Sequence, residues 1–187
     1  MKTATQNLEN DHVYILKLTE VMQKMAANGA TDINHFKSVV NVIQNYADGL
    51  HHKKEEDLLF PLFEKRNSGG HCGPVGVMLM EHAEGREYVR GMVESIEEFE
   101  GGNQLALQYI HHNMLGYAEL LQNHIYKENN ILFRMADNMF SDDDQSMLLD
   151  KFDEIEAGAE AGSKIENYVA AIRELANVYL LSKEMMA

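Results

Sequence analysis

The chain has 187 residues, of which 45% are hydrophobic, and a formal net charge of −14 at pH 7. This length suits one domain with a sizeable core, and the negative charge argues against nucleic acid or an anionic membrane surface as a partner, because phosphates would be repelled. No apolar run approaches the length of a membrane span, and the single cysteine, Cys72, excludes an internal disulfide and a cysteine-rich metal site. We expect a cytoplasmic protein.

The composition favours helix along nearly the whole chain. Ala, Leu, Met, Glu, Lys and Gln dominate, only 2 prolines occur, and alternating runs rich in Val, Ile and Thr are absent. The first helix is predicted from about Gln6 to Ala27, because apolar residues recur on one face of this segment. The pair Asn28-Gly29 should end it.

The second predicted helix is long, roughly Ile33 to Arg66, and starts from a cap at Thr31 or Asp32. Pro61 should bend this helix near its end, because proline has no N–H to donate. The segment from 67 to 73, rich in glycine, is the clearest loop of the chain. It separates two halves that resemble each other.

Two more long helices are expected after that loop. The third starts at Pro74, which suits a first helical turn, and continues to about Glu98. Gly101-Gly102 break it, and the fourth runs from about Asn103 to Asn138. Four long helices joined by short polar loops predict an all-α, up-down-up-down four-helix bundle over about residues 5–140.

Two shorter helices are predicted beyond the bundle. The residues from Ser141 to Asp144 form an N-terminal cap for a segment that reaches about Ala157. After a glycine-containing break, a last helix runs from Ser163 to about Ser182 with its apolar residues on one face. No linker divides the chain, so we expect a single domain, residues 1–187, whose helices at about 141–183 pack outside the bundle.

A repeated motif lies in the second and fourth helices. Residues 51–60 read HHKKEEDLLF, and residues 124–133 read HIYKENNILF. Both run His-x-x-x-Glu, then two polar residues, then aliphatic-Leu-Phe. One such pair is ordinary on a helix surface, but two copies with matching ends call for a common cause. Because positions four apart share a helix face, each copy can offer an imidazole and a carboxylate to an ion: His51 with Glu55, and His124 with Glu128.

The first and third helices carry a second repeated pattern. Residues 8–12 read LENDH and residues 78–82 read MLMEH, so each has an aliphatic residue, two variable ones, an acid and a histidine. Alone, either histidine would be a partly buried core residue. In a bundle, however, the two halves bring one cluster from each helix to a common axis. The predicted metal ligands are His12, His51, Glu55, His82, His124 and Glu128.

Four imidazoles and two carboxylates exceed what a tetrahedral zinc ion needs. They suit two octahedral ions that share both carboxylates as bridges, with a bridging oxide or hydroxide between them. Such a pair offers about twelve coordination positions, and roughly one position on each ion then stays open for a small molecule. The mixed nitrogen and oxygen ligands favour two iron ions, with manganese or a mixed pair as the alternative.

These motifs resemble the hemerythrin-like (HHE cation-binding) family. The resemblance covers roughly residues 5–140 and rests on four ordered stretches: NDH at 10–12, HHKKEEDLLFP at 51–61, GPVGVMLMEHAEGR at 73–86 and HIYKENNILF at 124–133. It implies a four-helix bundle with a non-haem di-iron centre. The family's ligands fall on the six residues already named.

The chain departs from the oxygen-carrying members of that family at two ligand positions. Those members use a fifth histidine one turn after the third-helix histidine, where this chain has Arg86, and an aspartate where it has Glu128. Losing a nitrogen ligand opens a coordination position, which moves the expectation from reversible oxygen carriage toward reaction with peroxide, nitric oxide or dioxygen. In this respect the chain is similar to the bacterial iron–sulfur repair proteins of the family, although it lacks their Cys-containing N-terminal domain.

Three functions compete on this basis. The first is a di-iron protein that reacts with a small diatomic or peroxide ligand, in oxidative or nitrosative stress or in iron-centre repair. The second is an oxygen- or iron-binding module for sensing or storage without catalysis. The third, a structural bundle with a degenerate site, is disfavoured, because buried His and Glu side chains without metal would be unsatisfied. Oligomeric state and electron donor are not encoded in the motifs.

The register of the first motif has an alternative. His52 could pair with Glu56 at the same spacing that joins His51 to Glu55. Aligning the phenylalanines that end the two motifs selects His51 with Glu55, and the sequence prediction follows that alignment.

Four neighbours of the predicted ligands have two readings each. Arg86 could hydrogen-bond an anion at the metal or form an ordinary salt bridge. Tyr117 could donate a hydrogen bond or proton near the centre, or its ring could fill the core. Asp11 and Glu81 could orient an imidazole, but a solvated helix edge is the reading we prefer.

The remaining candidate ligands are expected to be bystanders. By helical phase or loop position, His35, His71, His111 and His112 should be surface or structural residues. Cys72 should be inert. The 12 methionines follow helical periodicity, so we expect them to fill the core rather than bind copper.

Overall fold

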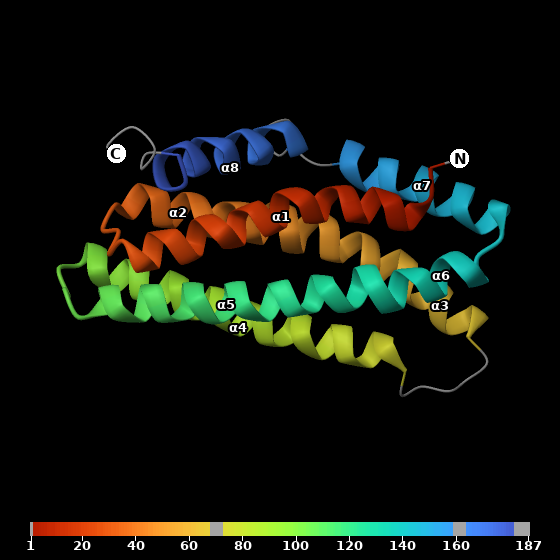
Figure 1. Cartoon of the computed structure of the whole chain (residues 1–187), viewed down its shortest axis with the longest axis horizontal. Helices are drawn as coiled ribbons and strands as arrows, with labels where there is room; N and C mark the ends of the chain where they lie inside the picture. The colour runs from red at the N-terminus through yellow and green to blue at the C-terminus, as the bar shows by residue number, and fades with distance from the viewer. Residues whose placement is uncertain (1, 68–72, 159–163, 182–187) are drawn as a thin grey trace.

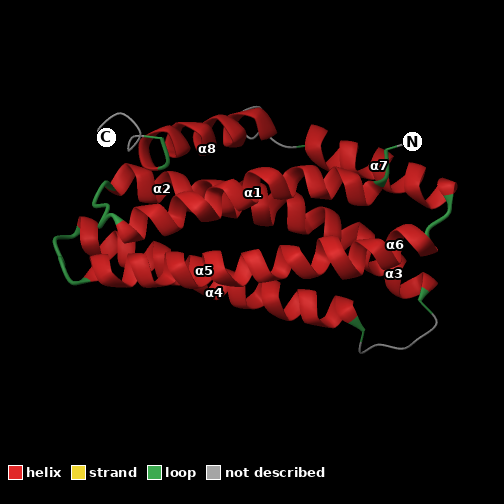
Figure 2. Ribbon diagram, viewed as in Figure 1, coloured by secondary structure: helices red, strands yellow, loops and turns green. Residues whose placement is uncertain are grey.

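The computed structural model describes residues 2–67, 73–158 and 164–181. Every regular element in these ranges is a helix, which confirms the all-α prediction (Figure 2). Four long rods lie side by side as a bundle, and two shorter helices lie along one side of it (Figure 1). Within the same ranges, no helix is long and apolar enough to cross a bilayer.

The first rod is α1 (Ala4–Ala27), which begins two residues earlier than predicted. Thr3 caps it, because the Thr3 side chain accepts the Gln6 N–H and the Gln6 side chain accepts the Thr3 N–H. Gly29 follows its end with φ 63°, a left-handed conformation that glycine adopts without strain. The predicted stop is confirmed.

The second rod spans Ile33 to Arg66 as predicted, but it is not a uniform α-helix. Asp32 caps it by accepting two backbone N–H groups. The rod then alternates between α- and π-helix, in the order α2 (Ile33–Val42), η1 (Ile43–His52), η2 (Glu55–Leu59) and α3 (Phe60–Arg66). Pro61 lies at the junction where the π-helical η2 passes into the α-helical α3.

The third rod is α4 (Pro74–Glu100), and the fourth consists of α5 (Ala106–Lys127), η3 (Glu128–Leu132) and α6 (Phe133–Met139). Both agree with the predicted helices to within a few residues. In Figure 1 the loops after α1 and α4 lie at the left end of the bundle, and α3 and α6 end at its right. Most of the predicted loop, residues 68–72, lies outside the described ranges.

The repeated motif has a structural counterpart in two matching π-helical segments. Both η2 and η3 are 5 residues long, and both start at a predicted ligand, Glu55 or Glu128. The phenylalanine after each segment, Phe60 or Phe133, donates its N–H to the carbonyl of that glutamate, five residues back. Short π-helical insertions frequently mark functional sites. The two motifs therefore encode the same local backbone as well as similar side chains.

Two helices follow the bundle. Ser141 and Asp144 form a capping box at the start of α7 (Asp142–Ala157), as predicted. The last helix, α8, covers Ile165–Tyr179; its predicted ends, Ser163 and Ser182, fall outside the described residues. α7 packs on α1 and η2, and α8 packs on α1 and α2. Both helices lie along the upper side of the bundle in Figure 1.

The buried apolar side chains form two clusters, with a polar layer between them. Along α1, for example, Leu8 belongs to one cluster and Ile15 to the other, while buried His12 lies between them. Phe152 of α7 joins the first of these clusters and Ile172 of α8 joins the second. The C-terminal helices thus complete the core on both sides of the polar layer.

Gly49 allows the backbone of η1 to take its π-helical form just before the first motif. A Cβ at this position would lie 2.9 Å from the carbonyl oxygen of Gln44, closer than real Cβ contacts allow. We expect Gly49→Ala to distort η1 and lower the melting temperature by roughly 2–10 °C. Thermal unfolding followed by circular dichroism measures the shift.

The control is Gly76→Ala in the first turn of α4, where a Cβ would meet nothing within 4 Å. Alanine suits a helix better than glycine by roughly 0.5–1 kcal/mol, so this variant should be unchanged or slightly more stable. Equal destabilisation by the two substitutions would contradict the role given to Gly49.

Candidate metal centre

The structure brings all six predicted ligands together in the polar layer. α1 contributes His12, α4 contributes His82, and each motif contributes its histidine and glutamate. All six side chains are buried, with exposed fractions of 0–2%: His12, His51, Glu55, His82, His124 and Glu128. Metal binding by these residues is a prediction from the sequence. Their geometry shows whether the donor atoms are close enough to hold an ion.

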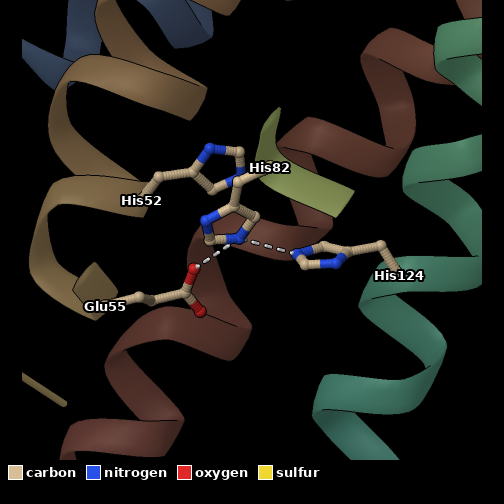
Figure 3. A group of neighbouring side chains, drawn as sticks. All are labelled: His52, Glu55, His82 and His124. Carbon is tan, nitrogen blue, oxygen red and sulfur yellow. Dashed lines mark hydrogen bonds and ion pairs between the residues drawn. The ribbon is translucent and has the colours of Figure 1, made fainter. Parts of the chain in front are cut away.

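Their donor atoms form two groups, and within each group all atoms lie within 4.8 Å of one another. We call them cluster A (His12, His51, Glu55 and Glu128) and cluster B (His52, His82, His124 and Glu55). Cluster B, drawn in Figure 3, contains a residue that was not among the predicted ligands, His52. The structure therefore places five imidazoles and two carboxylates at the centre.

In each cluster two imidazoles face each other at close range. The Nε2 atoms of His12 and His51 lie 3.0 Å apart, and those of His82 and His124 are also 3.0 Å apart. Two nitrogens bound at a right angle to one ion, each at about 2.1 Å, would be separated by about 3.0 Å. The spacing thus suits two ligands of a six-coordinate ion.

The two glutamates reach both clusters. Glu55 places one oxygen 3.6 Å from Nε2 of His51 and the other 3.6 Å from Nε2 of His82. Glu128 does the same, at 3.3 Å from His12 and 3.2 Å from His124. None of these four buried oxygens accepts a hydrogen bond from a described residue. Such groups are costly to bury unless a cation binds them, so the residues present fit a pair of bridged metal ions.

All five imidazoles point Nε2 inward because an oxygen on the other side holds Nδ1. The partners are Asn129 for His12, Asp11 for His51, Asp48 for His52, Glu56 for His82 and Glu81 for His124, at 2.7–3.4 Å. Each oxygen can accept the Nδ1–H, which leaves the Nε2 lone pair free. Metal-binding histidines in proteins are usually oriented in this way.

These contacts bear on three of the open sequence alternatives. The preferred reading of Asp11 and Glu81 as a solvated helix edge is wrong, because each accepts from an imidazole of the neighbouring rod. Arg86 forms an ordinary salt bridge, with Asp48 and Glu56. Glu56 does not pair with His52, since it lies against His82 and Arg86 outside both clusters.

His51 and His52 are not alternatives, because the side chains of both histidines reach the centre. In an α-helix successive side chains are 100° apart, so only one of them would face the axis. His51 and His52 end the π-helical segment η1, whose wider turn brings neighbouring side chains closer in direction. The counterpart of His52 in the second motif is Ile125, so the repeat alone gives no sign of a fifth imidazole.

Burial keeps most of the imidazoles neutral. It lowers the pKa of His51 to about 3 and also lowers the pKa values of His52 and His82. Burial acts on His124 in the same direction, but Glu128 and Glu81 outweigh it and raise its pKa. Neutral imidazole is the form that binds a metal ion, so three of the rings need no deprotonation on binding.

The two carboxylates cannot both ionise easily without a cation. Burial and the charge of Glu128 raise the pKa of Glu55 well above its ordinary value. Burial also acts to raise the pKa of Glu128, but His124 and His12 hold it below its ordinary value. The two pKa shifts have opposite directions, as expected for two buried carboxylates that share one site. Bound cations would stabilise the ionised form of both.

The remaining sequence expectations have mixed outcomes. His35 bonds the Tyr179 hydroxyl and His111 bonds the Ala30 carbonyl, which are structural roles as expected. His112 is exposed. Met22, Met25, Met78, Met92 and Met114 are buried in the core, whereas Met80 is 75% exposed. His71 and Cys72 lie outside the described residues.

A sequence model described as Hemerythrin HHE cation binding domain matches residues 3–136. The chain belongs to this family. The matched region contains every residue of clusters A and B, and it ends before the C-terminal helices α7 and α8. Neither curated proteins nor solved structures give a match. Membership in a cation-binding family and the convergence of seven His and Glu side chains independently indicate a metal site.

Outside the clusters, a lysine of each HHE motif contacts the acid that holds the motif's histidine. Lys54 lies 3.1 Å from Asp11, and Lys127 pairs with Glu81. The two lysines differ in their surroundings, because Lys54 is fully buried while the side chain of Lys127 is 33% exposed. Glu156 of α7 covers Lys54 at 2.5 Å. A C-terminal helix beyond the family match thus reaches the support of cluster A.

We expect Lys54→Met to cost about 2–5 kcal/mol of unfolding free energy, because it leaves Asp11 and Glu156 with unbalanced charge. Lys127→Met is the matched control at the equivalent motif position. Its pair is partly exposed, so the cost should be about 1 kcal/mol or less. Urea unfolding measures the unfolding free energy that each variant loses. Equal losses would contradict the claim that burial makes the Lys54 interactions the more important ones.

Proposed function

We propose that this protein holds two iron ions, one in each cluster, and that a small molecule such as dioxygen, peroxide or nitric oxide binds or reacts there. The observation that carries the proposal is the pair of fully buried carboxylates, each of which spans both clusters and accepts no hydrogen bond from the described part of the chain. Mixed imidazole and carboxylate donors suit iron, and manganese or a mixed pair is the alternative. Bound iron would supply an open coordination position for the small molecule.

The number of open positions depends on His52. With four imidazoles, two bridging carboxylates and a bridging oxide or hydroxide, about two of twelve positions stay open. A fifth imidazole in cluster B leaves about one, and it lies on the ion of cluster A, where His12 and His51 are the only imidazoles. As a ligand, His52 would restore the nitrogen whose absence at Arg86 had favoured reactivity over reversible binding. Its ring stacks on that of His82, with centroids 3.7 Å apart, so binding of both rings to one ion would require one ring to tilt.

The fifth imidazole therefore favours a second candidate function, a binding module for oxygen or iron in sensing or storage. The two candidates differ in catalysis: the reactive protein would consume its small molecule, whereas the binding module would bind and release it unchanged. Both candidates use the same bundle, whose up-down-up-down order is part of the proposal. That order is supported by loops after α1 and α4 at one end, while α3 and α6 end at the other (Figure 1).

Metal analysis of the protein as isolated should find about two ions per chain. Chelation should lower the melting temperature by roughly 5–15 °C, because ligand binding at 100–1,000 times its Kd stabilises by about 3–4 kcal/mol. The control is His112→Ala, which changes an exposed histidine and should behave as the unaltered protein. A melting curve that chelation leaves in place would contradict an occupied buried centre.

Azide is a probe for the number of open positions. We expect the iron-loaded protein to bind about one azide per chain and the His52→Ala variant about two, with iron content near two in both. Isothermal titration and the optical spectrum report the stoichiometry. If the unaltered protein already binds two azides, His52 is not a ligand.

Turnover separates the two candidate functions. Peroxide consumption by the iron-loaded protein above that of a His124→Ala control, in which cluster B loses a ligand, would support the reactive protein. Reversible dioxygen or nitric oxide binding with no consumption above the control would support the binding module instead. The absence of both would overturn the small-molecule part of the proposal.

A further inference from the structure

A cavity of about 270 Å³ lies beside cluster B, between the second rod, α4 and α5. Its inner end reaches the imidazoles of His52 and His82, and Arg86 and Arg90 line it with side chains 45% and 65% exposed. Its walls are largely apolar, and Ile43, Val89 and Val93 are among the residues that form them. The clusters account for the two histidines, but nothing in the proposed function uses this space.

The cavity lies where the two halves of the repeat have different residues at equivalent positions. Gly85 lies three residues after His82, and its counterpart three residues after His12 is Ile15. His52 and Asp48, which also line the cavity, correspond to Ile125 and Leu121 in the second motif. All three aliphatic counterparts are buried: Ile15, Leu121 and Ile125. Small and polar residues thus replace aliphatic ones on one side of the centre only.

Tyr117 is a polar group of the cavity wall whose hydroxyl has no partner among the described residues. Its side chain is 3% exposed, and no described residue hydrogen-bonds its hydroxyl. The hydroxyl oxygen is not among the enclosed atoms without a partner, so it opens onto the cavity. Gly85 leaves room beside the ring, because a Cβ there would already lie 3.4 Å from it. The hydroxyl is therefore a donor available to a molecule in the cavity.

The charged groups that line the cavity are already paired. Arg86 contacts Asp48 and Glu56, and Arg90 contacts Glu87. Asp48 also accepts from His52. A charged ligand would have to leave water without gaining an unpaired partner, which is unfavourable in a largely apolar space. The lining favours an uncharged ligand.

We propose that this cavity binds an uncharged organic molecule of about one ring, whose oxygen accepts a hydrogen bond from the Tyr117 hydroxyl. The cavity is far larger than a diatomic molecule needs, and it is slightly smaller than the roughly 300–1,000 Å³ of pockets for drug-sized ligands. The ligand lies against His52 and His82 without coordinating an ion, because cluster B has the fuller ligand set. This site is additional to the open position of the proposed function.

Cyclohexanone is a suitable probe, since it is uncharged, has one ring and has one acceptor oxygen. Its binding to the full chain as isolated is measured by ligand-observed NMR titration. We expect saturable binding, at least ten-fold tighter than that of cyclohexanecarboxylate or cyclohexylammonium. Tyr117→Phe should weaken the ketone roughly 3–10-fold, the effect of one hydrogen bond. Tyr109→Phe, which makes the same change at a 54% exposed site, should have no effect.

Val93→Phe fills the cavity from its wall and should abolish ketone binding, with the melting temperature as a check on folding. No saturable binding, equal binding of the three probes, or equal effects of the two tyrosine variants would each overturn the proposal. Metal analysis separates it from the proposed function. Ketone binding that depends on Tyr117 in a protein without metal would remove the iron proposal alone, and failure of ketone binding in a two-iron protein would remove the cavity proposal alone.

Discussion

The burial of two like-charged carboxylates at the centre of the bundle is the constraint on which the rest of the structure depends. Glu55 and Glu128 are fully buried and make no hydrogen bond to the described residues. Left alone, they would cost several kcal/mol of folding free energy. Around them stand imidazoles whose Nε2 lone pairs face inward, and these cannot compensate a negative charge either unless they gain protons. Bound cations would compensate the carboxylates and the imidazole lone pairs at once. The arrangement is therefore typical of a metal site and not of a hydrophobic core.

Residues at equivalent positions of the two halves orient the imidazoles in the same way. In each half, the acid before the first histidine holds the second histidine: Asp11 holds His51 and Glu81 holds His124. The residue after each motif glutamate reaches across to the other half, where Glu56 holds His82 and Asn129 holds His12. Four of the five rings are thus fixed by a rod other than their own, whereas Asp48 of the same rod holds His52. The ligand geometry depends on how the rods pack, and a change in packing would change metal binding without touching a ligand.

This dependence explains which features were predictable from the sequence. Helix ends follow from local signals such as the Ser141 cap and Gly29, and the six converging ligands follow from spacing and repetition, because both are properties of one helix at a time. The partners of Asp11 and Glu81 depend on the rotation of neighbouring rods, which no periodicity specifies. His52 was missed for a different reason: neighbouring residues of a uniform α-helix are 100° apart, whereas His51 and His52 both end the π-helical segment η1 and both belong to the clusters. Lys54 looks like a surface residue until α7 covers it.

The repeat also makes the differences between the two sides of the centre informative. On the side of cluster A, the aliphatic residue Ile15 fills the space, and α7 closes over Lys54 through Glu156. On the side of cluster B, Gly85 and Tyr117 leave a cavity that ends at His52 and His82. In the proposed two-ion centre, however, the open coordination position would fall to an ion of cluster A, on the enclosed side. His52 links the two sides of this comparison, because it belongs to cluster B and also lines the cavity. If His52 bound an ion of cluster B, a molecule in the cavity would meet its ring and not a metal, and this one side chain would separate the cavity from the ions.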